Sequence, residues 1–432
     1  MASYLAVSTR MRCRLVSLVA FAALSLLMAS VGRAQDRVVL YAAIGAELMQ
    51  YDANVESGAL IKRGSVTLPA NIQYAWPHPS RKYLYVAWSN GGSSYATPGA
   101  SIVPSGSQHG VSAFQIDSTS GALHLHGAPA MLPSRPIHVS TDPNGTHVLV
   151  AFNNPSGVMV YRLNNDGTIA PDPVKPAAPV DPGIYAHQVR VDPSNRMAIL
   201  VTRGNGPAGN KPEDPGALKI FSYEDGVLGN EISIAPGGGF NFQPRHLDFH
   251  PTRPWVLLSL ERQHKLQVYE KLKDGTLRPM ASFTQESLAD SSHVASRQNA
   301  GTVHVHPNGR FVYQANRAVT ADSAGRAVFS GGENSIAVYS INQKTGEPTR
   351  IQNIDTRGAE PRTFSLDASG RLLVAANQTP MVVREGSDEK VVPASLAVFR
   401  IGGDGKLEFI RKYDLQAGGS KSLYWMGLVS LP

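Results

Sequence analysis

The feature of the sequence that most limits the fold is a unit that recurs seven times: a strand with an aromatic residue, a turn containing glycine, and a further strand. Several of these turns hold an Asp-Gly or Thr-Gly pair, because glycine accepts the positive φ that a hairpin turn requires. Such a repeat indicates a supersecondary unit that must pack against copies of itself. The aromatic residues of the seven copies are Tyr51, Phe114, Tyr161, Phe221, Tyr269, Tyr339 and Phe399.

A second unit precedes most copies of the first and consists of a short strand, a turn that begins with His or Asp, and an apolar strand. It is found six times, and the two ends of the chain account for the missing copy. Arg37–Ala43 and Glu47–Leu60 would form a first blade that lacks its inner strand, and Ser422–Leu431 has the pattern of that strand. The six turns begin at His78, Asp142, Asp192, His250, His306 and Asp367.

Four strands per unit, at intervals of about 47–70 residues, predict an all-β fold, a seven-bladed β-propeller of four-stranded antiparallel blades. The C-terminal strand would close the ring in the first blade and remove the free edges that an open sheet exposes. A β-helix would need a much shorter period, and a helical solenoid would need a 3.6-residue periodicity that is not found. We expect residues 37–432 to form this single domain.

The first 34 residues are predicted to be a secretory signal peptide. Three arginines precede the mostly apolar run Leu15–Met28, and Gly32-Arg33-Ala34 offers small residues at a cleavage site. The run is short for a bilayer, which needs about 20 residues, although a retained signal anchor is the alternative. We therefore expect an exported protein, periplasmic or secreted, with no stable membrane insertion after the signal is removed. The one cysteine, Cys13, lies in this segment, so the remainder can form no disulfide or cysteine-ligated metal site.

The charge of the chain argues against a nucleic-acid partner. The net charge is +7, but the first 34 residues hold four arginines and no acid, so the remainder carries 36 basic against 33 acidic residues. A nucleic-acid binder normally has a basic stripe, and the sequence contains none. No Gly-x-Ser-x-Gly, His-Glu-x-x-His or Cys-x-x-Cys motif occurs, so we predict neither a metal nor a cofactor.

Long polar segments interrupt several blades and are predicted to be surface loops. In a four-stranded antiparallel blade, the start of the inner strand, the end of the second strand and the loop after it lie on one face. These loops would therefore surround any site built from those strand ends. The segments are Asn90–Gly110, Gly204–Gly216, Ala318–Glu333 and Thr379–Pro393.

Counting from each turn identifies equivalent positions in the blades, and polar residues gather at them. Arg245 and Glu261, sixteen residues apart on two antiparallel strands, should lie close together on one rim. In a propeller the equivalent positions converge around the central axis. Five residues before the turns stand Gln73, Ile137, His187, Arg245, Gly301 and Arg362, and eleven after them stand Ser89, Asn153, Arg203, Glu261, Arg317 and Gln378.

The mixture of residue types at these positions favours the binding of an anion. One carboxylate, a histidine and several arginines would meet there. Arginines that crowd together repel one another unless they pair with acids or receive an anionic ligand, and their planar fork suits a carboxylate or a phosphate. The alternative is a water-filled channel that is lined by polar groups and catalyses nothing.

Motifs around these positions are shared with a known family. They are Pro244-Arg245-His246 with His250-Pro251, Glu261 at a strand end, Ala186-His187 before Asp192-Pro193, His306-Pro307-Asn308-Gly309, Gln314-Ala315-Asn316-Arg317, Glu360-Pro361-Arg362 and Ala375-Ala376-Asn377-Gln378. Through them the chain from about residue 38 to 429 resembles the seven-bladed propeller lactonases, which include propeller-type 6-phosphogluconolactonases and fungal carboxymuconate-lactonising cyclases.

The resemblance implies a hydrolase that acts on a small anionic sugar-acid lactone, similar to a 6-phosphogluconolactonase. The family's proposed site comprises a histidine, two arginines and a glutamate, whose equivalents here are His187, Arg245, Glu261 and Arg317. Two other functions stay open: a carboxy-cis,cis-muconate cyclase and a non-catalytic binding propeller. Further candidates for substrate binding on the same rim are His246, Arg362, Arg203, Gln378 and Asn153.

These residue types predict a division of roles. Opening a lactone requires an activated water, stabilisation of the tetrahedral oxyanion and a proton for the leaving alkoxide. A carboxylate flanked by arginines is a poor base because its pKa falls. We therefore expect His187 to be the base, Glu261 to orient an arginine, and Arg245 and Arg317 to hold the substrate's anionic group and the oxyanion.

Overall fold

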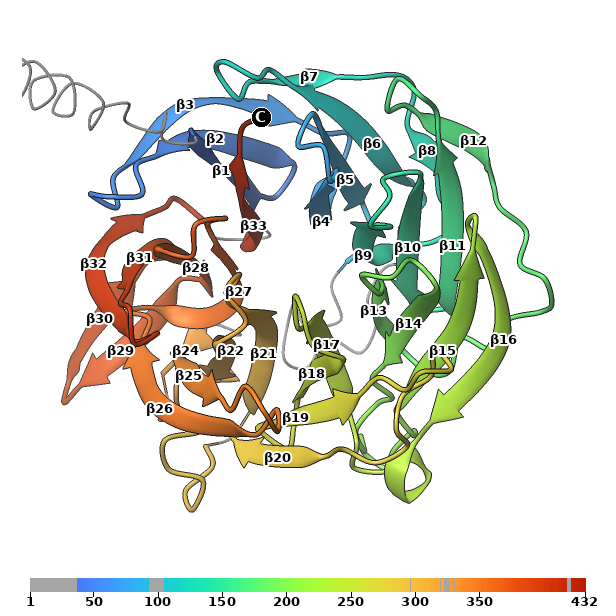
Figure 1. Ribbon diagram of the computed structural model, residues 1–432. Helices are drawn as coiled ribbons and strands as arrows, with labels where there is room; N and C mark the ends of the chain where they lie inside the picture. Colours follow the sequence, from blue (N-terminus) through green and yellow to red (C-terminus); the bar gives the residue numbers. More distant parts are fainter. Residues whose placement is uncertain are drawn as a thin grey trace, which may run out of the picture. The chain divides into compact units, whose positions relative to one another are not determined.

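A computed structural model describes residues 37–92, 105–295, 297–318, 320–321, 327–329, 331–417 and 421–432. In the unit Val38–Pro432, antiparallel sheets are arranged as blades around a common axis (Figure 1). The seven-bladed β-propeller predicted from the repeats is confirmed. The predicted signal peptide, residues 1–34, lies outside the described residues. Across the part of the chain that is described, no helix has the length and apolarity needed to cross a bilayer.

Each blade runs from an inner strand, nearest the axis, to an outer strand. In that order, blade 1 is β33 (Leu423–Ser430), β1 (Val38–Ile44), β2 (Glu47–Ala53) and β3 (Leu60–Thr67); blade 2 is β4 (Asn71–Pro77), β5 (Tyr83–Ser89), β6 (His109–Ile116) and β7 (Leu123–Leu125), with β8 (Ala130–Met131) also paired to β6; blade 3 is β9 (Pro136–Thr141), β10 (His147–Asn153), β11 (Ser156–Leu163) and β12 (Ile169–Pro173). Blade 4 is β13 (Ala186–Val191), β14 (Met197–Thr202), β15 (Ala217–Glu224) and β16 (Val227–Ile234); blade 5 is β17 (Pro244–Phe249), β18 (Trp255–Leu260), β19 (Lys265–Glu270) and β20 (Phe283–Glu286). Blade 6 is β21 (Gln298–Val305), β22 (Phe311–Ala318), β25 (Ser335–Ile341) and β26 (Pro348–Asp355); blade 7 is β27 (Ala359–Leu366), β28 (Leu372–Thr379), β31 (Ser395–Ile401) and β32 (Leu407–Asp414). A short 3₁₀ helix, η2 (Pro236–Gly239), precedes blade 5.

Burial explains why the strands differ in sequence. The second strand of a blade is covered on both faces by the neighbouring blades, and β10, which reads HVLVAFN, is buried along its whole length. The outer strand β3, which reads LIKRGSVT, is mostly exposed or half-buried. Large apolar side chains fill the space between blades, as Tyr313 of blade 6 does with Phe364 and Phe399 of blade 7. The core is therefore a set of layers between blades rather than one central core.

The predicted closure of the ring is confirmed in blade 1. β33 pairs antiparallel with β1, from Val38 opposite Ser430 to Ile44 opposite Leu423. The inner strand of this blade thus comes from the far end of the chain. Pairing of this kind leaves β1 without a free edge.

Hydrogen bonds at the turns join each blade to the next. His78, His250 and His306 each donate an Nε2–H to a carbonyl oxygen in the turn of the following blade, at 2.8–2.9 Å. The first acceptor is Gly145, where φ is +69° and an added Cβ would lie 2.3 Å from His78 Nε2. Only glycine fits there. Asp142, at another turn, accepts hydrogen bonds from the backbone N–H groups of its own turn and from the hydroxyl of Tyr223 in blade 4.

Two of the four segments predicted to be loops contain strands, so that prediction was wrong for them. The segment between β22 and β25 contains β23 (Thr320–Ala321) and β24 (Ala327–Val328). The segment between β28 and β31 contains β29 (Met381–Glu385) and β30 (Asp388–Val392). These four strands form a small sheet. Val328 pairs with Val382 in parallel. The two segments are polar in composition, but buried Val328, Met381 and Val382 supply an apolar contact between them.

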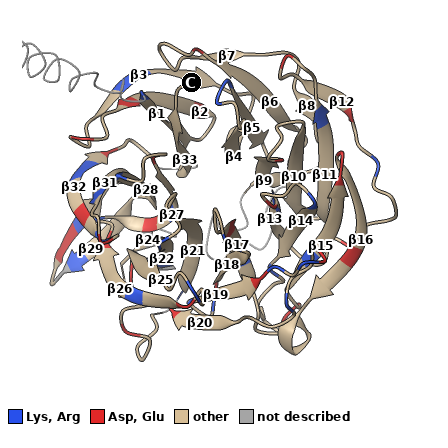
Figure 2. Cartoon of the chain, viewed as in Figure 1, with Lys and Arg blue, Asp and Glu red and all other residues tan. Residues whose placement is uncertain are grey.

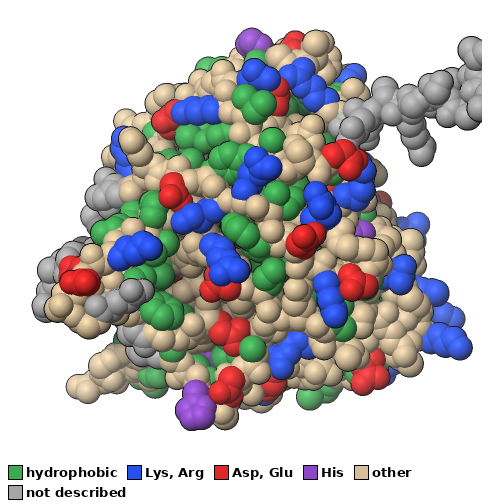
Figure 3. Space-filling model, turned by 90° about the vertical axis from the view of Figure 1, so that its left-hand side faces the viewer, with side chains coloured by type: hydrophobic (Ala, Val, Ile, Leu, Met, Phe, Trp, Pro, Cys, Tyr) green, Lys and Arg blue, Asp and Glu red, His purple; other side chains and the backbone are tan. Residues whose placement is uncertain are grey.

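Lys, Arg, Asp and Glu residues are spread around the ring, many of them on outer strands and turns (Figure 2). On the face drawn in Figure 3, Lys and Arg are interspersed with Asp, Glu and apolar side chains. That face therefore carries no basic stripe of the kind that nucleic acids bind.

Replacement of Tyr313 by Phe should show how much one hydrogen bond between blades contributes to the free energy of unfolding. The buried Tyr313 hydroxyl donates to the Gly405 carbonyl of blade 7 at 2.9 Å, and its loss leaves that carbonyl without this partner. We expect the free energy of unfolding, measured with urea, to fall by about 1–2 kcal/mol. Tyr83→Phe is the control, because no hydrogen bond of the Tyr83 hydroxyl is formed within the described residues. Equal stability of the two variants would contradict the assignment.

Candidate active site

Each inner strand carries a β-bulge at the same place, near the end at which the strand begins. In β17, Arg245 is left out of the pairing with β18, because Pro244 lies opposite Leu260 and His246 opposite Ser259. A bulge redirects the side chain of the extra residue and often adjoins a functional site. The residues left out are Gln73, Ile137, His187, Arg245, Gly301 with Thr302, Arg362 and Tyr424.

The six positions found by counting back from the turns are therefore the bulge residues of six blades. The seventh, Tyr424 of β33, could not be found in this way because no turn of the repeated type follows that strand. We call the end of the ring that carries these seven bulges the mouth.

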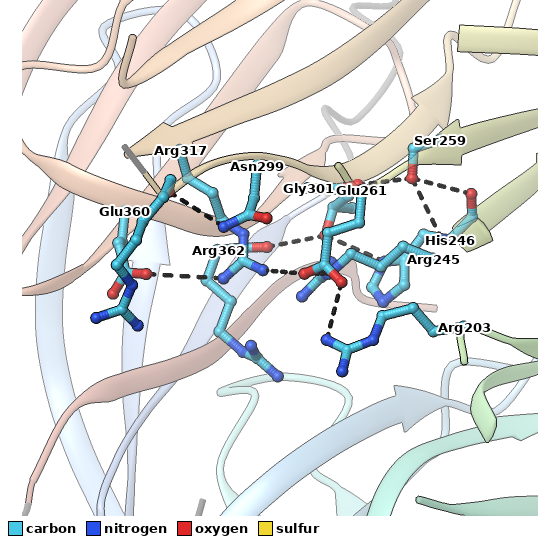
Figure 4. Close-up of polar contacts among 12 residues, drawn as sticks. Arg203, Arg245, His246, Ser259, Glu261, Asn299, Gly301, Arg317, Glu360 and Arg362 are labelled. Atoms are coloured by element: carbon cyan, nitrogen blue, oxygen red, sulfur yellow. Dashed lines mark hydrogen bonds and ion pairs between the residues drawn. The ribbon is translucent and has the colours of Figure 1, made fainter. Parts of the chain in front are cut away.

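A buried carboxylate shared by three arginines forms the centre of the site (Figure 4). Glu261 directly follows β18, and its Oε2 lies 2.9 Å from Arg203 Nη1. Its Oε1 lies 2.6 Å from Arg317 Nη2 and 3.3 Å from Arg245 Nε. Arg317 also approaches Glu360 at 3.8 Å. We call Glu261, Arg203, Arg245 and Arg317 the Glu261 cluster; it joins blades 4, 5 and 6, and the expected proximity of Arg245 and Glu261 is confirmed.

The arginines keep Glu261 ionised. Burial opposes its ionisation, but the charges of Arg203, Arg245 and Arg317 outweigh burial and hold the pKa of Glu261 well below its ordinary value of 4.5. A carboxylate with so low a pKa does not accept a proton near neutral pH. Its chemical capacity is to fix the positions of three guanidinium groups.

Two predicted histidines lie beside this cluster, close to the axis. The rings of His187 and His246 are 5.1 Å apart between centroids, and His246 Nδ1 lies 3.2 Å from Thr302 Oγ1. Burial, followed by the charge of Arg245, lowers the pKa of both rings well below the ordinary value. Both are therefore neutral imidazoles at neutral pH, the protonation state that a general base requires.

A third histidine at the axis was missed by the sequence analysis. His138 is fully buried, its ring centroid is 4.3 Å from that of Tyr74 and 6.1 Å from that of His246, and neither ring nitrogen has a hydrogen-bond partner within the described residues. Counting five residues back from the turn at Asp142 identifies Ile137, the residue directly before His138. The available signal was a histidine next to the counted position, between Ile137 and Val139 of β9.

The remaining predicted residues divide into two groups. Arg362 lies at the mouth but outside the Glu261 cluster, with its guanidinium 3.9 Å above the ring of Tyr424. Asn153 and Gln378 are buried near the ends of β10 and β28, and neither takes part in the ion pairs of the cluster. Their part in substrate binding stays a prediction. Across the described residues, no group of three His, Cys, Asp or Glu side chains is arranged to hold a metal ion.

Comparisons with known proteins agree with this architecture. Residues 31–384 match a family described as "Lactonase, 7-bladed beta-propeller". A 6-phosphogluconolactonase of Bacillus subtilis strain 168 is 31% identical over 285 residues, which cover 64% of this chain and 73% of that protein. A 6-phosphogluconolactonase of Formosa agariphila is 24% identical over 348 residues, which cover 77% of this chain and 86% of that protein. Among solved structures, a periplasmic gluconolactonase of Pseudomonas aeruginosa is similar in fold, with a TM-score of 0.66 and 19% identity over 92% of this chain and 100% of that chain.

Replacement of Glu261 by Gln should destabilise the protein in a pH-dependent way. At pH 7 the change leaves the buried Arg245 and Arg317 and the half-buried Arg203 without their shared carboxylate, and we expect the free energy of unfolding to fall by about 3–5 kcal/mol. Because the folded-state pKa lies below the ordinary 4.5, the stabilisation by ionised Glu261 is complete above that value and is lost as the pH falls through the folded-state pKa. The difference between parent and variant should therefore shrink below about pH 4.5.

Urea unfolding at several pH values measures this difference. Glu270→Gln is the control, because Glu270 pairs with Arg278 on the surface, where such a pair contributes about 1 kcal/mol or less. A Glu261→Gln variant as stable as the control at pH 7 would refute the role given to the cluster.

Proposed function

The chain belongs to the seven-bladed β-propeller lactonase family, and we propose that it hydrolyses a small lactone that carries an anionic group. The observation that carries the proposal is the excess of arginine over acid at the mouth. Arg203, Arg245 and Arg317 share Glu261, while Arg362 forms no ion pair with an acid in the described parts of the chain. A sugar-acid lactone, such as the phosphorylated one for which the relatives are named, fits this charge.

In the proposed reaction His187 is the general base. Its neutral ring takes a proton from a water molecule whose oxygen attacks the carbonyl carbon of the lactone. The acyl C–O bond of the tetrahedral intermediate then breaks, and the ring oxygen leaves with the proton from His187. The products are a hydroxyl group and a carboxylic acid, which ionises at neutral pH.

Arg245 and Arg317 stabilise the negative charge that forms on the carbonyl oxygen. Both are held by Glu261, so their positions are set before the substrate binds. A donor that is already in place does not have to reorganise in the transition state, and one such group contributes about 3–4 kcal/mol in well-studied hydrolases. Glu261 is thus a positioning residue in this proposal.

The test is turnover of a panel of sugar-acid lactones, including D-glucono-1,5-lactone and its 6-phosphate. We expect the parent to hydrolyse at least one of them, and His187→Ala to lower kcat/KM by a factor of about 10²–10⁴. His124→Ala, on the exposed face of β7, is the matched control. If no lactone is turned over, the hydrolase assignment fails for these substrates. Ring closure of a muconate-type diacid would favour the cyclase, and binding without turnover would favour a binding propeller.

We also propose that the protein acts outside the cytoplasm, on the support of the arginines, apolar run and small residues of Met1–Ala34. When the full chain is expressed in a bacterial host, the mature protein should be recovered outside the cytoplasm with Gln35 as its first residue. Replacing Leu26 and Leu27 by Arg should block export. An unprocessed parent chain that stays in the cytoplasm would contradict the proposal.

A further inference from the structure

Two arginines at the mouth, outside the Glu261 cluster, are buried and have no acidic partner among the described residues. Arg135 is 6% exposed and Arg362 is 5% exposed. Neither forms an ion pair with Asp or Glu in the part of the chain that is described, whereas Arg203, Arg245 and Arg317 all reach Glu261. In Figure 4 the Arg362 side chain runs away from the ion pairs of Glu261, and no dashed line reaches its guanidinium.

Both arginines contact the same aromatic side chain. The Arg362 guanidinium lies 3.9 Å above the ring of Tyr424, and Arg135 Nη2 donates to the Tyr424 hydroxyl at 2.9 Å. Tyr424 is itself 8% exposed and is the bulge residue of β33. We call Arg135, Arg362 and Tyr424 the Tyr424 cluster. It combines residues from blades 7 and 1 with one that directly precedes blade 3.

Among the described residues, no acidic side chain neutralises the charges of Arg135 and Arg362. A guanidinium cannot lose its proton in a protein, so its burial is not relieved by neutralisation. An unpaired buried ion costs several kcal/mol, and two of them on one tyrosine also repel each other. The Arg135 Nε atom is buried and without a hydrogen-bond partner among the described residues. The neighbouring His109 responds to the same positive field, since burial and then the charge of Arg135 lower its pKa.

The Tyr424 cluster lies within reach of the Glu261 cluster. The Thr302 hydroxyl, 3.2 Å from His246 Nδ1, donates to the Arg362 carbonyl at 2.9 Å, so the Arg362 backbone lies close to His246. The Arg362 charge also contributes to lowering the pKa of both His187 and His246. Arg362 and Arg245 are bulge residues of blades 7 and 5, and only blade 6 separates those blades in the ring. A single small molecule can therefore contact both clusters.

We propose that Arg135 and Arg362, on either side of Tyr424, bind a phosphate or carboxylate group of the substrate while its lactone ring lies against His187 and the Glu261 cluster. This inference rests on the proposed function for the identity of the bound molecule. Two guanidinium groups offer paired N–H donors to the oxygens of such a group, and the anion removes the cost of burying their charge. The Tyr424 cluster is in this way a determinant of specificity, separate from the groups that open the ring.

The first experiment measures anion binding without any reaction. Inorganic phosphate and, separately, citrate are titrated into the parent, Arg135→Gln, Arg362→Gln and the double variant by calorimetry and thermal unfolding. We expect phosphate, citrate or both to bind the parent, with an affinity at least 10-fold lower in each single variant. The anion that binds more tightly identifies the group. Arg162→Gln is the matched control, because Arg162 is exposed and paired with Asp225, and it should bind like the parent.

Thermal unfolding without added anion separates a binding role from a structural one. If the arginines are uncompensated charges, their replacement by Gln should leave the unfolding temperature equal or higher, and the rise in that temperature on adding anion should be lost. Variants that unfold at a lower temperature but keep the full response to anion would overturn the proposal.

The second experiment compares D-glucono-1,5-lactone with its 6-phosphate. We expect the ratio of kcat/KM for the phosphorylated over the neutral lactone to fall at least 10-fold in Arg135→Gln and Arg362→Gln, mainly through KM. A parent that hydrolyses both lactones, with a ratio unchanged in the variants, would refute the Tyr424 cluster as the anion site and leave the proposed function standing. A parent that binds phosphate through these arginines but hydrolyses no lactone would refute the proposed function and leave the anion site standing.

Discussion

The β-bulge at the start of every inner strand is the constraint on which the site depends. Side chains of a regular strand alternate between its two faces, so adjacent residues cannot both point toward the axis. The extra residue in the bulge breaks this alternation, and Arg245 and His246 then both reach the centre of the ring. Because the bulge recurs in every blade, the propeller presents one redirected side chain per blade at the same end. The chemistry of the mouth is set by the residues in those seven places together with the residues at the ends of the second strands, such as Arg203, Glu261 and Arg317.

Electrostatics divides the mouth into two halves with different roles. In blades 4 to 6, one carboxylate fixes the positions of three arginines through its ion pairs. Arg362 of blade 7 and Arg135, which precedes blade 3, are instead held by the tyrosine Tyr424 rather than by an acid. The first arrangement suits a group whose charge develops during a reaction. The second suits a group that is charged from the outset, and in the reaction that we propose the two arrangements together orient an asymmetric substrate.

Much of this could be predicted from the sequence because the signals are local and repeated. Hairpin turns, apolar strands and the unpaired first and last segments predicted the ring and its closure in blade 1. Counting from the turns worked for His187, Arg245 and Arg362 because each bulge stands at the same distance from its turn. The same counting could not reach Tyr424, which no repeated turn follows, nor Arg135, which lies in a connection outside the repeat. The small sheet of β23, β24, β29 and β30 was not predicted. It joins two segments that are far apart in the sequence, and no local sequence pattern indicates that they pair.

The closure of blade 1 by β33 has a consequence for how the protein is made. The strand that pairs with Val38–Ile44 arrives only when residues 423–430 have emerged, so the ring stays open until that point of synthesis. Until then β1 has a bare edge to which another chain can add. Tyr424 belongs to β33, so the proposed anion site is completed when β33 pairs with β1 and closes the ring. A nascent or clipped chain without that strand is therefore at once prone to aggregate and unable to recognise its ligand.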